Sequence, residues 1–500
     1  MKSTSSGRVA LTLLVGQLVF LFSLQAAQIQ PPGQRPQPLG AHALVGGRVV
    51  VKPDTVLENS TILIRDGRIE AVQNAQAKLP ADARVWAMKG KTIYAGFIDP
   101  YLSLGDKPSE RAKPIANRWT QPIDARAGVS FTGVPTTKTD MGAKGPGYEI
   151  AEVHPEQRVS AKFSPDAKAV AELRALGFTA ANFIPTEGIY RGSSALALLG
   201  EGNPNQLILN PKTFQHLAFS PAGDYPKSLM GVIAVVRQTV FDAQHYSAMK
   251  DWAAKNPNGQ RPEYNPALEA MYPPTRSKAK QPMVIETGSV LMIARAAKLS
   301  EELGFKPIYV ATGHEWRRPD LIKKIGSHFI VPVVFPAKPD LPEADDWEQI
   351  SLDQLRAWDW APEIPALLRS HKRSISLTTH GLADRKVFRK NIARAIERGL
   401  KETDALAALT TEPAALLGAS AQLGTIEKGK LANLTIVDGG SWFEPENIVS
   451  AVWVEGRHFA NDIPKPEDDK KAADKKKPEA KPEPRVAKAP GDYRGVLKAP

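Results

Sequence analysis

Two patterns of apolar residues divide this chain, one typical of β-strands near both ends and one of helix–strand repeats between them. Apolar runs at 43–51 and 61–72 are punctuated by turn residues, and Asp66-Gly67 predicts a type I′ hairpin. Strand-like runs return at 424–439 and 448–459. We therefore expect one small β domain built from both ends of the chain, residues 41–95 and 422–460.

The central region alternates helical and strand-like segments. Four expected helix–strand pairs are 166–176 with 178–184, 289–303 with 306–311, 318–325 with 328–335, and 352–370 with 374–379. In the next helix Phe388, Ile392, Ala395 and Ile396 share one face. This rhythm predicts an α/β fold over residues 96–421, either a parallel barrel or a doubly wound sheet. Residues 103–165 are less regular and are interpreted as an insertion with loops.

The two termini have the composition of export and linker segments. Residues 1–27 resemble a signal peptide: Lys2 and Arg8 precede an apolar run that small residues close. The run is shorter than the roughly 20 residues of a membrane span, so we expect no stable span after cleavage. An uncleaved anchor is the alternative. A Pro/Gln-rich linker at 28–40 and a disordered Lys/Pro/Ala-rich tail at 461–500 complete the predicted organisation of a secreted or periplasmic protein.

Composition narrows the function classes. The chain carries 65 basic and 53 acidic residues, a net charge of +12 that is spread along its length. Without a basic stretch interleaved with aromatic residues, nucleic-acid binding is not expected. The absence of cysteine excludes disulfides, cysteine-ligated zinc, iron–sulfur clusters and thiol catalysis.

Several motifs resemble the amidohydrolase superfamily, in particular its secreted imidazolonepropionase-like members. They are RDGRIEAV (65–72), GFID (96–99), the helical segment 391–414, LTTEPAALLG (409–418) and LGTIEKGKLANLTIVDG (423–439). The resemblance implies a (β/α)8 barrel with a split β-sandwich. It also implies hydrolysis of carbon–nitrogen bonds other than peptide bonds, by one or two divalent ions, normally zinc, held mainly by histidines at the strand ends.

At the metal-ligand positions of that family, this sequence departs from the pattern. Tyr101 and Ser103 replace the two histidines of the first strand, Glu286 and Ala311 replace those of strands five and six, and His380 replaces the final aspartate. The region from Met271 to Pro274 offers no lysine or glutamate for strand four. We therefore expect no bound metal and no other cofactor.

Two residues at these positions could still bind an ion. Glu286 and His380, perhaps joined by Asp99, could rebuild a metal site; the alternative is that they pair with each other or with nearby polar groups. Asp99 is expected to have a supporting, structural role.

Other candidates for ligand contact lie in predicted loops. Ser193 and Ser194 follow a predicted strand that ends at residue 184, and similar loops in the family border the active site. His314 and Glu315 begin an H-E-x-x-H pattern, but Arg318 stands at the second ligand position, so we interpret them as a loop after strand six.

The resemblance and the altered positions together favour a non-catalytic amidohydrolase-like protein. It would act as a structural or regulatory partner of a second, active amidohydrolase module, or as a homo-oligomer. Two alternatives are a working carbon–nitrogen hydrolase with an altered site and a small-molecule binding protein.

Overall fold

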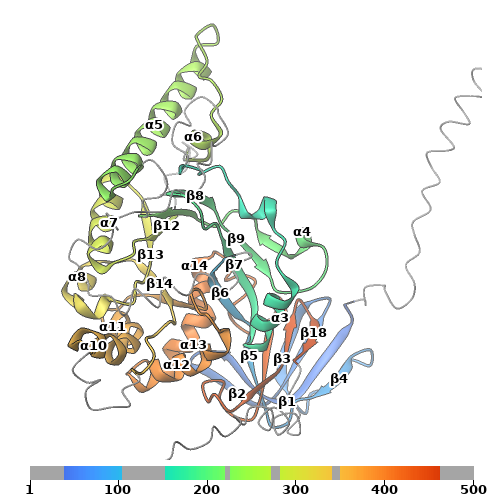
Figure 1. Cartoon of the computed structure of the whole chain (residues 1–500). Helices are drawn as coiled ribbons and strands as arrows, with labels where there is room; N and C mark the ends of the chain where they lie inside the picture. Colours follow the sequence, from blue (N-terminus) through green and yellow to red (C-terminus); the bar gives the residue numbers. More distant parts are fainter. Residues whose placement is uncertain (1–38, 104–151, 220–225, 272–281, 340–349, 462–500) are drawn as a thin grey trace, which may run out of the picture.

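The computed structural model of this chain describes residues 39–103, 152–219, 226–271, 282–339 and 350–461 (Figure 1). The predicted leader, nearly all of the predicted linker and the predicted tail lie outside these residues. So does most of the predicted insertion at 103–165. Within the described residues, no helix combines the length and apolarity that crossing a bilayer requires.

Strands and helices follow one another in the mixed order expected of an α/β protein. The strands are β1 (Ala41–Lys52), β2 (Thr55–Arg65), β3 (Arg68–Asn74), β4 (Arg84–Ala87), β5 (Lys91–Ala95), β6 (Phe97–Ser103), β7 (Phe178–Ile184), β8 (Tyr190–Ser193), β9 (Ala195–Leu198), β10 (Ile208–Asn210), β11 (Gln215–Ala218), β12 (Pro282–Glu286), β13 (Lys306–Val310), β14 (His328–Pro332), β15 (Ile375–Thr378), β16 (Leu434–Asp438), β17 (Ile448–Val454) and β18 (Arg457–Ala460). The α-helices are α3 (Ala167–Ala175), α4 (Pro204–Leu207), α5 (Leu229–Lys255), α6 (Pro266–Met271), α7 (Val290–Leu303), α8 (Pro319–Lys324), α10 (Leu352–Trp360), α11 (Ile364–Ser370), α12 (Phe388–Glu397), α13 (Glu402–Leu409) and α14 (Thr411–Leu416).

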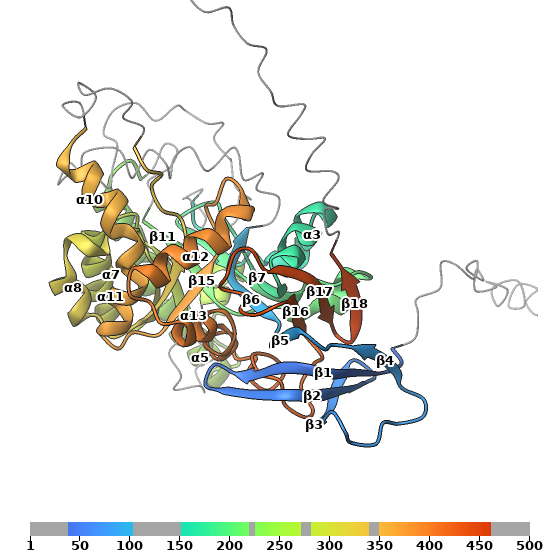
Figure 2. The same ribbon diagram turned by 90° about the horizontal axis from the view of Figure 1, so that it is seen from below.

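One sheet contains strands from both ends of the described chain. Its order is β18-β17-β16-β5-β1-β2-β3, with β4 also pairing with β1, and the two ends meet where β16 runs antiparallel to β5 (Figure 2). The predicted hairpin joins β2 to β3, and Asp66 (φ 50°) and Gly67 (φ 80°) both adopt the positive φ that a type I′ turn needs. These strands form a single hydrogen-bonded sheet.

The remaining strands form two further sheets that carry the candidate site. One has the order β15-β14-β13-β12-β11-β8 and the other β10-β9-β7-β6. The strands from β11 to β15 are parallel and follow one another in chain order, as do β6 and β7. At the junction of the two sheets, the Thr378 hydroxyl oxygen at the end of β15 lies 2.9 Å from the Tyr101 carbonyl oxygen of β6. The described strands do not form one closed ring.

Most elements predicted for the central region are confirmed. The strand at 178–184 is β7, and the helices expected at 166–176, 289–303 and 318–325 are α3, α7 and α8. The strand expected at 328–335 is shorter: β14 ends at Pro332, and Val333 makes one further backbone bond, to the Thr378 carbonyl at 3.2 Å. The predicted face of α12 is confirmed: Phe388, Ile392 and Ala395 are buried, and Ile396 packs against the same core.

A buried tryptophan joins the terminal sheet to the helices around the parallel strands. Trp442, in the loop between β16 and β17, is fully buried with its ring 4.9 Å from that of Phe97. Arg389 of α12 donates to three backbone carbonyls of this loop, those of Trp442, Glu444 and Asn447. One side chain therefore fixes the loop to the helix layer.

Helix α5 extends from the body of the molecule, with α6 beside its far end (Figure 1). Its buried positions include Val232, Val235, Val236 and Val240 in the first half, which pack into the main core. Towards its other end Trp252 is half exposed. The helix is thus anchored at its beginning and projects at its end.

Candidate active-site region

The carboxyl ends of the parallel strands hold a cluster of polar side chains around Glu286. Glu286 is the last residue of β12, and one of its carboxylate oxygens, Oε2, accepts two hydrogen bonds. The Tyr101 hydroxyl donates at 3.0 Å and the Arg191 guanidinium at 2.6 Å. The Arg191 side chain is only 10% exposed and that of Glu286 27%. Glu286 is therefore neutralised by a neighbouring cation supplied by β8.

Burial and charge keep Tyr101 and Arg191 in their ordinary protonation states. Burial, and then the negative charge of Glu286, raise the pKa of the Tyr101 hydroxyl well above its usual value, so it stays a neutral donor. Burial alone would lower the pKa of Arg191, but the Glu286 carboxylate outweighs burial and the pKa is raised. The cluster combines one neutral phenol with one internally compensated ion pair.

Asp99 links the first and last of the parallel strands. It is fully buried, and its two oxygens accept four hydrogen bonds. Oδ1 accepts from the Tyr101 N–H (3.0 Å) and the Thr378 hydroxyl (2.6 Å). Oδ2 accepts from the N–H (3.0 Å) and the hydroxyl (2.7 Å) of Thr379. This carboxylate is saturated by protein donors, and its contacts hold the end of β15 against β6.

A chain of hydrogen bonds fixes the protonation state of a buried histidine beside Tyr101. The Pro100 carbonyl can only accept, so Asn182 must turn its amide nitrogen towards it (3.1 Å) and its oxygen towards the Thr213 hydroxyl (2.7 Å). Thr213 has one proton and gives it to Asn182. The 2.7 Å contact between Thr213 and Ser194 then requires the Ser194 hydroxyl to donate.

His216 completes this chain. Its Nε2 lies 2.8 Å from Ser194 Oγ, whose only proton is already committed to Thr213, so Nε2 carries the proton and donates. Nδ1 of His216 is then a bare lone pair; it is buried and has no hydrogen-bond partner in the described part of the chain. Burial lowers the pKa of His216 to about 3, so the ring is neutral at neutral pH.

The two serines do not lie in an open loop as the sequence analysis expected. Ser193 ends β8 and donates to the Gln157 carbonyl at 3.3 Å, and Ser194 follows directly; both are buried. The expectation is wrong because residues 190–193 pair with β11 and form a strand. Since His216 donates to Ser194, it cannot also accept the serine proton, and the pair is not arranged for nucleophilic attack.

The remaining positions singled out by the resemblance lie at or just after strand ends, and His380 among them contacts Tyr101. Ser103 ends β6, and Ala311 directly follows β13 and is buried. His380 follows β15 and packs its ring edge-on against Tyr101, with the ring centroids 4.9 Å apart. Of the two alternatives for Glu286, the geometry favours pairing with nearby polar groups, because Tyr101 and Arg191 both donate to its carboxylate.

These residues do not fit a catalytic metal ion. In the described ranges no three His, Asp or Glu side chains converge as a metal site requires. Tyr101 is a neutral phenol, and Ala311 has no donor atom. The carboxylate of Glu286 already faces the Arg191 cation at 2.6 Å, where a divalent ion would meet a like charge.

His314 and Glu315 form a local turn after β13. The buried Glu315 carboxylate accepts from the N–H (2.6 Å) and hydroxyl (2.9 Å) of Thr312 and from the N–H of Gly313 (3.0 Å). His314 is also buried. Glu315 therefore stabilises the turn, in line with the loop interpretation.

Two central residues, Arg191 and His216, escaped the sequence analysis. The sequence analysis sought the fourth barrel strand near Met271, but Met271 ends helix α6. The strand that pairs with β12 is β11, and it contains His216. The run Phe214–Phe219, bounded by Asn-Pro and Ser-Pro, was the available signal for β11. Arg191 gave no local signal, because its partner lies 95 residues away.

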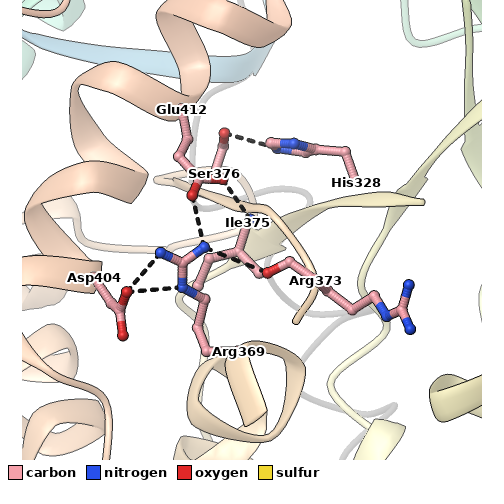
Figure 3. A network of polar contacts seen from close by, with 7 residues as sticks. All are labelled: His328, Arg369, Arg373, Ile375, Ser376, Asp404 and Glu412. Atoms are coloured by element: carbon pink, nitrogen blue, oxygen red, sulfur yellow. Dashed lines mark hydrogen bonds and ion pairs between the residues drawn. The ribbon is translucent and has the colours of Figure 1, made fainter. Parts of the chain in front are cut away.

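A second polar network lies at the opposite, amino ends of the strands (Figure 3). There Arg369 pairs with Asp404 and Glu412, and Glu412 accepts from the first N–H of β15, that of Ile375, at 3.0 Å. His328, which begins β14, bonds to Ser376 at 2.9 Å through Nε2. Burial, and then the charge of Arg369, lower the pKa of His328 to about 4. This network ties helices α11, α13 and α14 to the sheet.

Comparisons with known proteins agree with this fold. The sequence model of the amidohydrolase family matches residues 359–470. The crystal structure of an amidohydrolase from Thermotoga maritima MSB8 superposes with a TM-score of 0.64 at 20% identity, covering 84% of this chain and 99% of that one. A putative prolidase from Bifidobacterium longum matches with a TM-score of 0.45 at 14% identity, covering 88% and 99% of the two chains. Among curated protein sequences, none matches.

Proposed function

We propose that this chain is a non-catalytic member of the amidohydrolase superfamily and serves as a structural or regulatory partner of an active amidohydrolase module, with the family match over residues 359–470 and the shared fold as support. The proposal includes a (β/α)8 barrel whose strand ends carry the altered site, a β domain whose sheet is completed by strands from both ends of the described chain, and export to the periplasm or the exterior.

One observation carries the proposal, the contact of Arg191 and Tyr101 with the same oxygen of Glu286. A metal-dependent hydrolase needs carboxylates and imidazoles left available for the ion, which lowers the pKa of a bound water to about 7. Here the carboxylate at the strand end is held by a buried guanidinium, and the second carboxylate, Asp99, is saturated by four protein donors. His216 uses one nitrogen to hold Ser194. Nothing in this arrangement activates a water.

Strand order supports the barrel. A doubly wound sheet reverses its strand order near the middle, whereas β11 to β15 are added one after another in chain order, as in a barrel. The hydrogen bond from Thr378 of β15 to Asp99 of β6 also supports it, because it joins the last of these strands to the first.

The test is metal analysis of the purified full chain together with assays on a panel of amide, imide and amidine substrates, with zinc, manganese or iron supplied. We expect far less than one ion per chain, no turnover above buffer, and no change on chelation. A working hydrolase of the same superfamily serves as positive control. Chelator-sensitive turnover that Glu286→Ala or His380→Ala abolishes would instead establish a working hydrolase with an altered site.

The partner role has a separate test. An amidohydrolase encoded beside this chain is co-expressed with it, and the sedimentation of the mixture is compared with that of each protein alone. A stable complex in which the active partner gains turnover or stability supports the role. Independent sedimentation with unchanged activity contradicts it.

A further inference from the structure

We propose that one face of helix α5 is the contact surface for a second copy of this chain, with the two α5 helices packed antiparallel about a two-fold axis at Phe241. This face, called the α5 stripe below, is formed by the exposed side chains of Met230, Ala234, Phe241, Ala248 and Trp252. The inference goes beyond the proposed function and does not depend on whether the strand ends bind a metal ion.

The stripe lies on the side of α5 that faces away from the core. An α-helix turns by about 100° per residue, so residues 11 apart differ in direction by only about 20°. Met230, Phe241 and Trp252 have this spacing and are 81%, 49% and 50% exposed. Val232 and Val236, which anchor the helix in the core, lie on the opposite side. Large apolar side chains aligned on a projecting helix indicate a contact surface.

The residues of the stripe follow nearly the same order in both directions from Phe241. Positions at equal distances before and after it carry similar residues: Gln238 and Gln244, Ala234 and Ala248, Met230 and Trp252. A two-fold contact uses the same surface of both copies. When two helices pack antiparallel about such an axis, a residue before the axis lies beside the partner's residue at the same distance after it. Ala234 would therefore meet the partner's Ala248, and Met230 the partner's Trp252.

The shape of the molecule suits this arrangement. Helix α5 begins on the body and projects at its end, so in an antiparallel pair each projecting end lies beside the anchored beginning of the other helix (Figure 1). There α5 and α7 line a hollow of about 460 Å³, whose apolar residues include Met230, Ile233 and Ala234. The partner's Trp252 would enter this hollow. Its ring already packs against Gly259, where a Cβ would not fit, so it loses little freedom on contact.

The charge of the hollow also suits the partner's end. Arg295 and Lys298 of α7 are exposed at the hollow, and Arg237 holds the Glu302 carboxylate through two hydrogen bonds of 2.6 and 2.8 Å. The hollow is therefore basic. Asp251, exposed near the projecting end of α5, lies on the flank that faces this hollow in the antiparallel pair, so the contact brings a carboxylate to the two α7 cations.

The first experiment is sedimentation velocity of the full chain over a range of concentrations. We expect a dimer, and we expect Phe241→Arg to raise its dissociation constant roughly 100-fold or more, because two guanidinium groups would meet at the axis in place of two rings. Leu352→Arg is the matched control: Leu352 is 60% exposed on α10, outside the stripe, so this protein should dimerise as the parent does. Both variants should keep the urea midpoint of the parent, since neither residue is buried.

The second experiment tests the direction of packing. The chain has no cysteine, so an introduced cysteine is its only thiol. Phe241→Cys should form a disulfide between copies on mild oxidation, because the two residues face each other across the axis. Met230→Cys should not link to itself, since its two copies would lie about 33 Å apart at a rise of 1.5 Å per residue. Mixed with Trp252→Cys protein, it should be linked by a short bismaleimide.

Three results would overturn the inference: a monomer at every concentration, a dimer that Phe241→Arg leaves intact, or linkage of Met230→Cys to itself. Should Phe241→Arg fail to fold, the pattern of cysteine linkage decides the question alone. None of these variants alters the strand ends, so either outcome leaves the test of the proposed function, by metal content and turnover, unaffected.

Discussion

Replacing Asp99 by asparagine should destabilise the protein strongly, although the two side chains have nearly the same shape. Each carboxylate oxygen of Asp99 accepts one backbone N–H and one threonine hydroxyl. Asparagine turns one of these oxygens into a donor. A threonine hydroxyl can rotate and accept from it, but the backbone N–H of Tyr101 or Thr379 cannot.

The magnitude follows from these four bonds. One buried N–H left without an acceptor costs about 1–3 kcal/mol, and the remaining bonds lose the strengthening that a charged acceptor gives. We expect a total of about 3 kcal/mol, a large part of the roughly 5–15 kcal/mol that stabilises a typical domain. At a slope of about 3 kcal/mol/M, the urea midpoint would fall by roughly 1 M.

The assay is urea unfolding followed by tryptophan fluorescence, with Asp438→Asn as control. Asp438 also accepts two bonds, from Lys91 and Ser450, but its side chain is 40% exposed, so water replaces the lost bonds and the change should stay below about 1 kcal/mol. An Asp99→Asn protein as stable as the parent would refute the structural role of Asp99. A loss of stability that is absent in the presence of a chelator, and appears only when metal ions are available, would refute it as well.

Two further predictions concern charge. Burial lowers the pKa of His216 to about 3 and of His328 to about 4, so between the unfolded value of about 6.5 and pH 4 the unfolded chain binds more protons. Stability should therefore fall as pH falls through this window. In the His328→Gln protein the urea unfolding midpoint should depend less steeply on pH. The same pH dependence as in the parent protein would contradict this. Arg389→Met should release the loop 442–447, with faster hydrogen exchange of its amides and a loss of about 3 kcal/mol. Arg385→Met, which removes an ion pair with the exposed Glu172 and no contact to this loop, should leave exchange there unchanged.

The sequence predicted those elements whose pattern is complete within a short stretch. Helix α12 was recognisable because Phe388, Ile392 and Ala395 repeat at helical spacing, and its apolar face is buried as expected. The hairpin of β2 and β3 follows from Asp66-Gly67, since few other pairs adopt two successive positive φ angles without strain.

The composition of the site could not be predicted in the same way. Glu286 was identified as an altered position, but its partner Arg191 comes from β8, which pairs antiparallel with β11 and has no counterpart in the helix–strand rhythm. Likewise, the proton on His216 depends on the orientation of an amide 34 residues earlier in the chain, Asn182, which in turn depends on Pro100. Such chains of contacts exist only once the sheets have formed.

The pairing of β5 with β16 has a consequence for synthesis of the chain. Lys91 and Asp438, which meet at 2.5 Å, are separated by 347 residues. At a translation rate of about 5–20 residues per second, β5 waits roughly 20–70 s before its neighbour has been made. During that time its edge has unpaired N–H and C=O groups on which another nascent chain could add a strand. A chaperone that covers this edge until residue 438 has emerged would therefore increase the yield of folded protein, and deleting β16 would leave the edge open permanently.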